Sequence, residues 1–112
     1  MRLGLAEVAF AGVVLAVLSI PPTLGWVPRN QVYGFRFPAT LRSDAVWYAI
    51  NRRFGRELIV IGMVLATMAI SLDAAGLDTP ASRTVAGVAM VASLLTTTAR
   101  GWRAANRLER RL

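Results

Sequence analysis

The sequence predicts an all-α integral membrane protein with three transmembrane helices and a short amphipathic helix at the cytoplasmic membrane surface. Hydrophobic residues make up 55% of the chain and the mean hydropathy is +0.51, which is too apolar for an ordinary soluble domain. Long neutral stretches also alternate with short stretches rich in arginine. The chain has 112 residues, so we expect one domain over residues 1–112.

The first apolar run predicts a transmembrane helix over residues 3–20. Eighteen helical residues rise roughly 27 Å, close to the thickness of the hydrocarbon core of a bilayer. Pro21-Pro22 is expected to end the helix. A signal peptide is disfavoured by Glu7 inside the run and by the poor cleavage context after it. Glu7 is costly near the outer end unless it is hydrated or paired, and Arg83 is the candidate partner at the same predicted depth.

Residues 21–57 form a chemically varied segment that we call the motif connector. It contains both tyrosines, two of the three tryptophans and six of the thirteen arginines. Loops with varied side chains often carry function, whereas apolar helices mostly serve as scaffold. We expect extended or turn structure over residues 21–34, because prolines bias their neighbours away from the helix.

The later part of the motif connector predicts a short helix over residues 41–54. Thr40 is a candidate N-cap, and Ser43 is the alternative. Trp47, Ile50 and Phe54 fall on one helical face, and several arginines fall on another. A basic amphipathic helix with aromatic residues is typical of the membrane surface, so we expect it to lie along the inner surface. Its apolar face is expected to turn to lipid or to the helix bundle.

Two further spans are expected over residues 58–77 and 80–99. Between them, Asp78-Thr79-Pro80 combines a capping residue with a proline in the first turn, which indicates a helix start. The third run ends in hydroxyl residues that can donate to their own helix. Residues 100–112 form a basic tail in the cytoplasm, with arginines at near-helical spacing.

Small residues are expected at the contacts between helices, because lipid provides no hydrophobic drive for helices to associate. One pair of small residues, four positions apart, lies in each run. These pairs are Gly12 with Ala16, Gly62 with Ala66, and Ala89 with Ser93.

The arginines predict the orientation of the chain. Eleven of the thirteen lie in the motif connector or the tail, which share one side of a three-helix topology. The positive-inside rule then places the N-terminus outside and the C-terminus inside. All three tryptophans lie near the predicted inner interface. We therefore expect a multi-pass protein of the bacterial cytoplasmic membrane, with anionic lipid head groups as partners of the inner face.

The composition also excludes several classes of function. The chain has no cysteine and no histidine, so the usual thiolate nucleophile, general base and metal ligand are missing. Its six acidic residues are scattered, with no cluster at the spacing of metal ligands. We expect no catalytic residues, no metal and no cofactor. The apolar runs explain the net charge of +7 better than nucleic-acid binding does.

The motif connector resembles the SdpI family of small bacterial membrane proteins. The resemblance is carried by Asn-x-x-Tyr-Gly-Phe-Arg, then Thr-Leu, then Trp-x-x-x-Asn. The matching residues are Pro28, Arg29, Asn30, Tyr33, Gly34, Phe35, Arg36, Pro38, Thr40, Leu41, Trp47, Asn51 and Gly55. The chain departs from the family at Phe37, where members tend to have threonine.

The resemblance implies immunity to a secreted peptide toxin, membrane signalling through a bound partner, or both. Physical arguments from the residues leave two alternatives, an accessory subunit of a larger membrane complex and a small transporter component. The runs lack the ionisable residues that ion-coupled transport places at membrane depth. The predicted partners are a peptide toxin or another membrane protein, in addition to lipid.

The residues expected to form a binding site all lie in the motif connector. Arg36 offers a planar fork suited to a phosphate or carboxylate, and Gly34 permits a turn that a side chain would block. These residues could equally brace the connector against the helix ends. The full predicted set is Asn30, Tyr33, Gly34, Phe35, Arg36, Thr40, Trp47 and Asn51.

Overall fold

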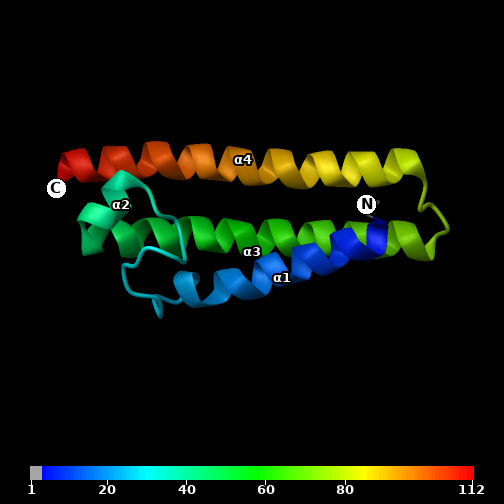
Figure 1. The fold of residues 1–112 in the computed structure, drawn as a ribbon, viewed down its shortest axis with the longest axis horizontal. Coiled ribbons are helices and arrows are strands. Elements are labelled where there is room, and N and C mark those ends of the chain that lie inside the picture. Colours follow the sequence, from blue (N-terminus) through cyan, green and yellow to red (C-terminus); the bar gives the residue numbers. More distant parts are fainter. Residues whose placement is uncertain (1–3) are drawn as a thin grey trace.

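A computed structural model describes residues 4–112, and all of their regular secondary structure is helical. The elements are α1 (Leu5–Thr23), α2 (Pro38–Arg42), α3 (Asp44–Ala74) and α4 (Pro80–Arg111). The long helices α3 and α4 run antiparallel, and α1 lies along α3 (Figure 1). The end of α1, the helix α2 and the C-terminus share one end of the bundle, and the hairpin between α3 and α4 lies at the other (Figure 1). The expectation of an all-α fold is confirmed.

The prediction that Pro21-Pro22 ends the first helix is wrong. Both prolines lie inside the last turn of α1. A proline has a φ compatible with a helix and loses only its own N–H bond, which is tolerable where a helix is about to end. The turn is completed by the N–H groups of Leu24 and Gly25, which donate to the carbonyls of Ile20 and Pro22 at 3.0 and 3.2 Å.

The separate amphipathic helix is also a wrong prediction, because residues 44–54 are the first three turns of the 31-residue helix α3. The break comes earlier, at Ser43, whose hydroxyl accepts from the N–H of Val46 as the N-cap of α3. Ser43 was the alternative cap, and Thr40 lies inside the short helix α2. The apolar face of this segment packs inside the protein, because Trp47, Ile50 and Phe54 are only 0–3% exposed. Of the two expected surroundings of this face, lipid and the helix bundle, the structure shows the bundle.

The hairpin between α3 and α4 follows the capping signals in the sequence. After α3, the N–H of Leu77 donates to the carbonyl of Leu72 at 2.9 Å, and that of Gly76 donates to Asp73 at 3.0 Å. This is the Schellman pattern, and it places Gly76 at a φ of +74°. Helix α4 then begins with Thr79 as N-cap and Pro80 in its first turn. The predicted helix start is confirmed, and the basic tail continues α4 without a break.

The first two of the predicted small-residue pairs meet where α1 crosses α3. A Cβ added at Gly12 would lie 2.6 Å from the carbonyl oxygen of Gly62, and one added at Gly62 would lie 2.3 Å from that of Gly12. Ala16 and Ala66 sit beside this crossing and are buried. On α4, a Cβ added at Gly87 would meet nothing within 4 Å, so no neighbour approaches that helix closely at this point.

Two hydrophobic clusters stabilise the ends of the bundle. The cluster near the hairpin joins α1 to α3 through Leu5, Val8, Ala9 and Ala69. The cluster at the other end joins α2, α3 and α4. Its buried members are Phe37, Ala39, Val46, Ile50, Phe54, Ala104 and Ala105.

In the described part of the chain, two helices are long and apolar enough to cross a membrane. These are α1 and α3, each with a mean hydropathy of 1.9 over its most apolar stretch. Only 39% and 22% of those stretches are buried inside the protein. Helix α4 does not meet the same criterion, so a third span stays a prediction.

The ion pair between Glu7 and Arg83 is not formed among residues 4–112. Arg83 instead donates from its Nε to Oδ1 of Asp78 at 2.7 Å and from Nη2 to Oδ2 at 3.3 Å. Asp78 is closer to Arg83 in sequence and lies in the hairpin, where both groups reach each other without strain. The Arg83 guanidinium lowers the pKa of Asp78, mainly by this hydrogen bond. Glu7 is exposed, in agreement with the alternative of hydration.

Substitution of the crossing glycine should weaken the bundle. Gly62→Ala should reduce the free energy of unfolding in detergent by about 1–3 kcal/mol, because a methyl group has no room beside Gly12. Gly87→Ala is the matched control, with open space at its Cβ, and should be neutral or stabilising by about 0.5–1 kcal/mol. Thermal unfolding monitored by tryptophan fluorescence measures both. Equal effects of the two substitutions would contradict the close crossing.

Candidate functional site

Asn30 shapes the first turn of the motif connector. Its Oδ1 accepts from the N–H groups of Val32 and Tyr33 at 2.8 and 2.7 Å. Its Nδ2 donates to the carbonyls of Pro28 and Tyr33 at 2.8 and 3.1 Å. These four bonds use both donors of the amide and both acceptor positions of its oxygen. Asn30 therefore holds the loop and has no spare donor for a ligand.

Trp47 and Asn51, one turn apart on α3, attach the loop to the helix. The indole Nε1 of Trp47 donates to the carbonyl of Val27 at 2.9 Å. The buried amide of Asn51 donates to the carbonyl of Trp47 at 2.9 Å, and its Oδ1 accepts from the N–H of Phe35 at 2.7 Å. Because both side chains are almost completely buried, these bonds fix two points of the loop against α3.

Gly34 passes directly over these two side chains. Its φ of +110° lies in a region that other residues rarely adopt. A Cβ at this position would lie 2.7 Å from Oδ1 of Asn51 and 3.1 Å from the ring of Trp47. Both the backbone conformation and the space therefore require glycine here.

Thr40 closes the last turn of the loop. Its buried Oγ1 accepts from the N–H of Phe37 at 2.8 Å and lies 2.8 and 2.9 Å from the carbonyls of Phe35 and Phe37, to which it donates. The hydroxyl thus binds the start of α2 to the loop before it. Thr40 acts as a brace and is not accessible to a ligand.

Two phenylalanines of the loop pack against α3 and α4. The ring of Phe37 meets Trp102 edge-on with centroids 5.4 Å apart, and Phe35 lies 6.0 Å from Phe54. A Cβ at Gly101 would lie 3.2 Å from the ring of Phe37, so glycine lets α4 approach. Phe37 therefore has a packing role between the loop and α4.

Ion pairs at the surface reinforce this arrangement. Arg42 of α2 forms a two-pronged pair with Glu109 of α4, with Nε to Oε2 at 2.9 Å and Nη2 to Oε1 at 2.7 Å. This hydrogen bonding lowers the pKa of Glu109 and raises that of Arg42. Arg29 lies 3.4 Å from Asp44 and donates to the carbonyl of Leu41 at 3.1 Å.

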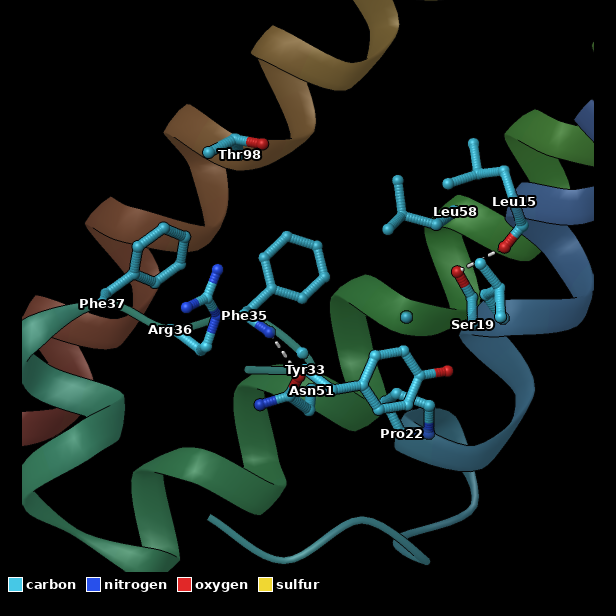
Figure 2. Close-up of a pocket in the computed structure, with 13 residues that line it drawn as sticks. Leu15, Ser19, Pro22, Tyr33, Phe35, Arg36, Phe37, Asn51, Leu58 and Thr98 are labelled. Carbon is cyan, nitrogen blue, oxygen red and sulfur yellow. Dashed lines mark hydrogen bonds between the residues drawn. The ribbon is translucent and has the colours of Figure 1, made fainter. Parts of the chain in front are cut away.

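A pocket of about 450 Å³ lies between the motif connector, α1, α3 and α4. In Figure 2, Phe35 and Phe37 lie on the side of α4, whereas Leu15, Ser19 and Leu58 lie on the side of α1 and α3. The lining residues are Leu15, Leu18, Ser19, Pro22, Tyr33, Gly34, Phe35, Arg36, Phe37, Asn51, Gly55, Leu58 and Thr98. We call it the connector pocket.

Arg36 and Tyr33 give the connector pocket its polar character. Arg36 is exposed and donates from Nη1 to the carbonyl of Gln31 at 2.6 Å, but it pairs with no carboxylate among residues 4–112. Its remaining N–H groups are available to an anionic group. Burial raises the pKa of the Tyr33 hydroxyl, which stays a neutral donor at physiological pH. The pocket can therefore hold an apolar group with one polar or anionic end.

The structure divides the predicted site into two groups. Five residues line the connector pocket, namely Tyr33, Gly34, Phe35, Arg36 and Asn51. Asn30, Thr40 and Trp47 instead hold the frame around it. The wall from α1 and Thr98 of α4 was missed, because apolar residues at helical spacing look the same whether they face lipid, a core or a pocket. Within residues 4–112, no three carboxylate, histidine or cysteine side chains lie together as metal ligands would.

The comparison with protein families gave one match. The model of the SdpI/YfhL protein family covers residues 26–99, which is more than half of the chain and includes the whole motif. Comparisons with curated proteins and with solved structures gave no match.

Gly34→Ala should destabilise the protein by more than the strain of a positive φ alone would. Gly76→Ala is the matched control, since it also has a positive φ, of +74°, but nothing within 4 Å of its Cβ. We expect Gly34→Ala to reduce the free energy of unfolding by about 1–3 kcal/mol more than Gly76→Ala does, because Asn51 and Trp47 must move to make room for the methyl group. Thermal unfolding in detergent measures the difference. Equal losses would show that the loop does not press on α3.

Proposed function

Because the chain belongs to the SdpI/YfhL protein family, we propose that it is a non-catalytic membrane protein that acts by binding, in immunity to a peptide toxin, in membrane signalling, or in both. The binding site of this proposal is the connector pocket. The observation that carries it is the position of Arg36, which stands in the wall of an apolar pocket with no carboxylate partner in the described chain. A peptide with an apolar side chain next to an acidic group or a C-terminal carboxylate fits this chemistry.

We further propose that three helices cross the bilayer, with the N-terminus outside. Exposed apolar side chains surround the bundle on every long helix, including α4. On α4 they are Val85, Val88, Val91 and Leu95, which are 57–69% exposed. Water-soluble proteins rarely leave so large an apolar surface uncovered, and a bilayer would cover it. Residues 84–99 of α4 contain no ionisable side chain, and sixteen helical residues rise roughly 24 Å.

The motif connector would then lie at the cytoplasmic end. The longest dimension of the structure is 52 Å, which exceeds a hydrocarbon core of about 30 Å. The part of the structure that exceeds the hydrocarbon core would be the arginine-rich end, where the connector and the end of α4 lie together (Figure 1). Anionic head groups would meet these arginines.

Single cysteines test this topology, since the native chain has none. Ala81→Cys, in the first turn of α4 next to the hairpin, should react with an impermeant maleimide in intact cells, whereas Leu112→Cys should react only after the membrane is opened. Both positions are exposed, so poor access cannot explain a lack of reaction. The opposite labelling pattern would overturn the proposed orientation. Reaction of both cysteines in intact cells would show that α4 does not cross the membrane.

Arg36→Lys tests the binding role. Lysine keeps the charge but cannot form a two-pronged contact, so toxin protection should weaken by about tenfold in toxin dose, with unchanged folded yield in detergent. Arg103→Lys is the matched control on exposed α4, outside the connector pocket. A loss of folded yield would show that Arg36 braces the fold. Full toxin protection with normal folded yield would show that Arg36 is not part of the binding site. Fixed stoichiometric co-purification of another membrane protein, with no protection, would favour the accessory subunit.

A further inference from the structure

A second cavity lies on another side of α3, away from the motif. It is an open groove of about 510 Å³ between α3 and α4, which we call the α3–α4 groove. Its wall from α3 consists of Arg56, Glu57, Val60 and Ile61. Its wall from α4 consists of Ala92, Ser93, Thr96, Thr97 and Arg100. No residue of the groove belongs to the predicted site.

Glu57 leaves one carboxylate oxygen without a partner in this groove. Its Oε1 accepts a short hydrogen bond from Nη1 of Arg100. Its Oε2 is buried and accepts no hydrogen bond from the described chain. A buried, unpaired carboxylate oxygen is costly, because it has lost contact with water without gaining a donor.

The hydroxyls of α4 in the groove are also unpaired. Several helix hydroxyls in the described chain, though not that of Thr98, donate to the carbonyl four residues earlier. This holds for Ser19, Thr23, Thr67, Ser71 and Thr84. Ser93, Thr96 and Thr97 form no such bond within residues 4–112, contrary to the expectation from the sequence, and they face the groove. They can therefore bond to an occupant.

The groove offers groups for both signs of charge. Glu57 attracts a cation that can donate a hydrogen bond, and Arg56 and Arg100 attract an anion. Arg100 is also held over the ring of Phe54, with its guanidinium carbon 5.6 Å from the centroid. An occupant that carries an ammonium and a phosphate a few ångströms apart satisfies all of these groups at once.

An apolar stripe continues from the groove toward the hairpin. On α3, Val64 and Met68 follow Glu57 and Ile61 at helical spacing and are 50% and 57% exposed. On α4, Val88 precedes Ala92 by one turn and is 63% exposed. The charged groups lie at the boundary between the apolar and arginine-rich parts of both helices. A lipid head group lies at such a boundary, and its acyl chain would follow the stripe.

We propose that the α3–α4 groove binds a phospholipid whose head group carries a primary ammonium, as in phosphatidylethanolamine. The ammonium lies beside the carboxylate of Glu57 and donates to the α4 hydroxyls, and the phosphate accepts from Arg56 and Arg100. This site rests on the proposed membrane placement and does not depend on which ligand the connector pocket binds. A volume of about 510 Å³ is in the usual range for small-molecule sites.

Competition between lipids with identical acyl chains tests the proposal in the wild-type chain. The full chain in mixed micelles is given equal amounts of phosphatidylethanolamine and phosphatidylcholine, and native mass spectrometry counts each lipid retained. We expect about tenfold preference for phosphatidylethanolamine, because the quaternary ammonium of phosphatidylcholine has no N–H to donate. Phosphatidylglycerol, which has the phosphate but no ammonium, should also be retained less than phosphatidylethanolamine. Equal retention of phosphatidylethanolamine and either of the other two lipids, or displacement by soluble phosphoethanolamine alone, would overturn the lipid site.

Glu57→Gln locates the site. Glutamine keeps the size of the side chain but removes the charge that attracts an ammonium, so the preference should fall to near unity. Glu109→Gln is the matched control, because Glu109 also pairs with an arginine but lies outside the groove. An unchanged preference in Glu57→Gln would place the lipid elsewhere.

If Glu57→Gln fails to fold, the wild-type competition still decides whether the ammonium is recognised. Thr97→Val then takes the place of Glu57→Gln, with an expected loss of preference. Arg36→Lys should leave the preference intact, which separates this site from the connector pocket.

Discussion

The close crossing of α1 and α3 at Gly12 and Gly62 is the contact on which the rest of the structure depends. With the two backbones this near, the end of α1 stays against α3, where Ser19 and Thr23 lie over Gly55. The motif connector therefore starts beside α3 and can fold back onto its first turns. Helix α4 has no comparable contact and is held mainly at its ends. One tight helix pair and one looser helix leave space on two sides of α3, which is where both cavities lie.

Much of the helical framework could be predicted, because its signals are local. Thr79-Pro80 marks the start of α4, and Gly12 and Gly62 mark the closest helix contact. The wrong predictions arose where local patterns have two meanings. The amphipathic face of Trp47, Ile50 and Phe54 resembles that of a helix on a membrane surface. The structure instead buries this face against the loop, α2 and α4, and nothing in the spacing distinguishes a buried face from one that lies on a membrane.

The candidate site shows the same limit in another form. The motif gave five residues of the connector pocket and three that brace it, but it could not separate the two roles. Whether a residue braces the loop or lines the pocket depends on contacts with residues far away in the sequence. Asn51 is a brace as well as a wall, because its amide binds the N–H of Phe35, sixteen residues earlier in the chain. Thr98 enters the pocket from α4 only because Phe37 and Gly101 set the distance of that helix.

Helix α4 forms part of the wall of both cavities, through adjacent residues. Thr97 faces the α3–α4 groove and Thr98 lines the connector pocket. A rotation of α4 about its axis would therefore widen one cavity as it narrows the other, whereas α1 and α3 cannot yield at their glycine contact. The aromatic contact of Phe37 with Trp102 and the pair of Arg42 with Glu109 resist such a rotation at one end. An occupant of the groove that ties Arg100 and Thr97 to α3 would resist it further along the helix, and would thereby fix the shape of the connector pocket.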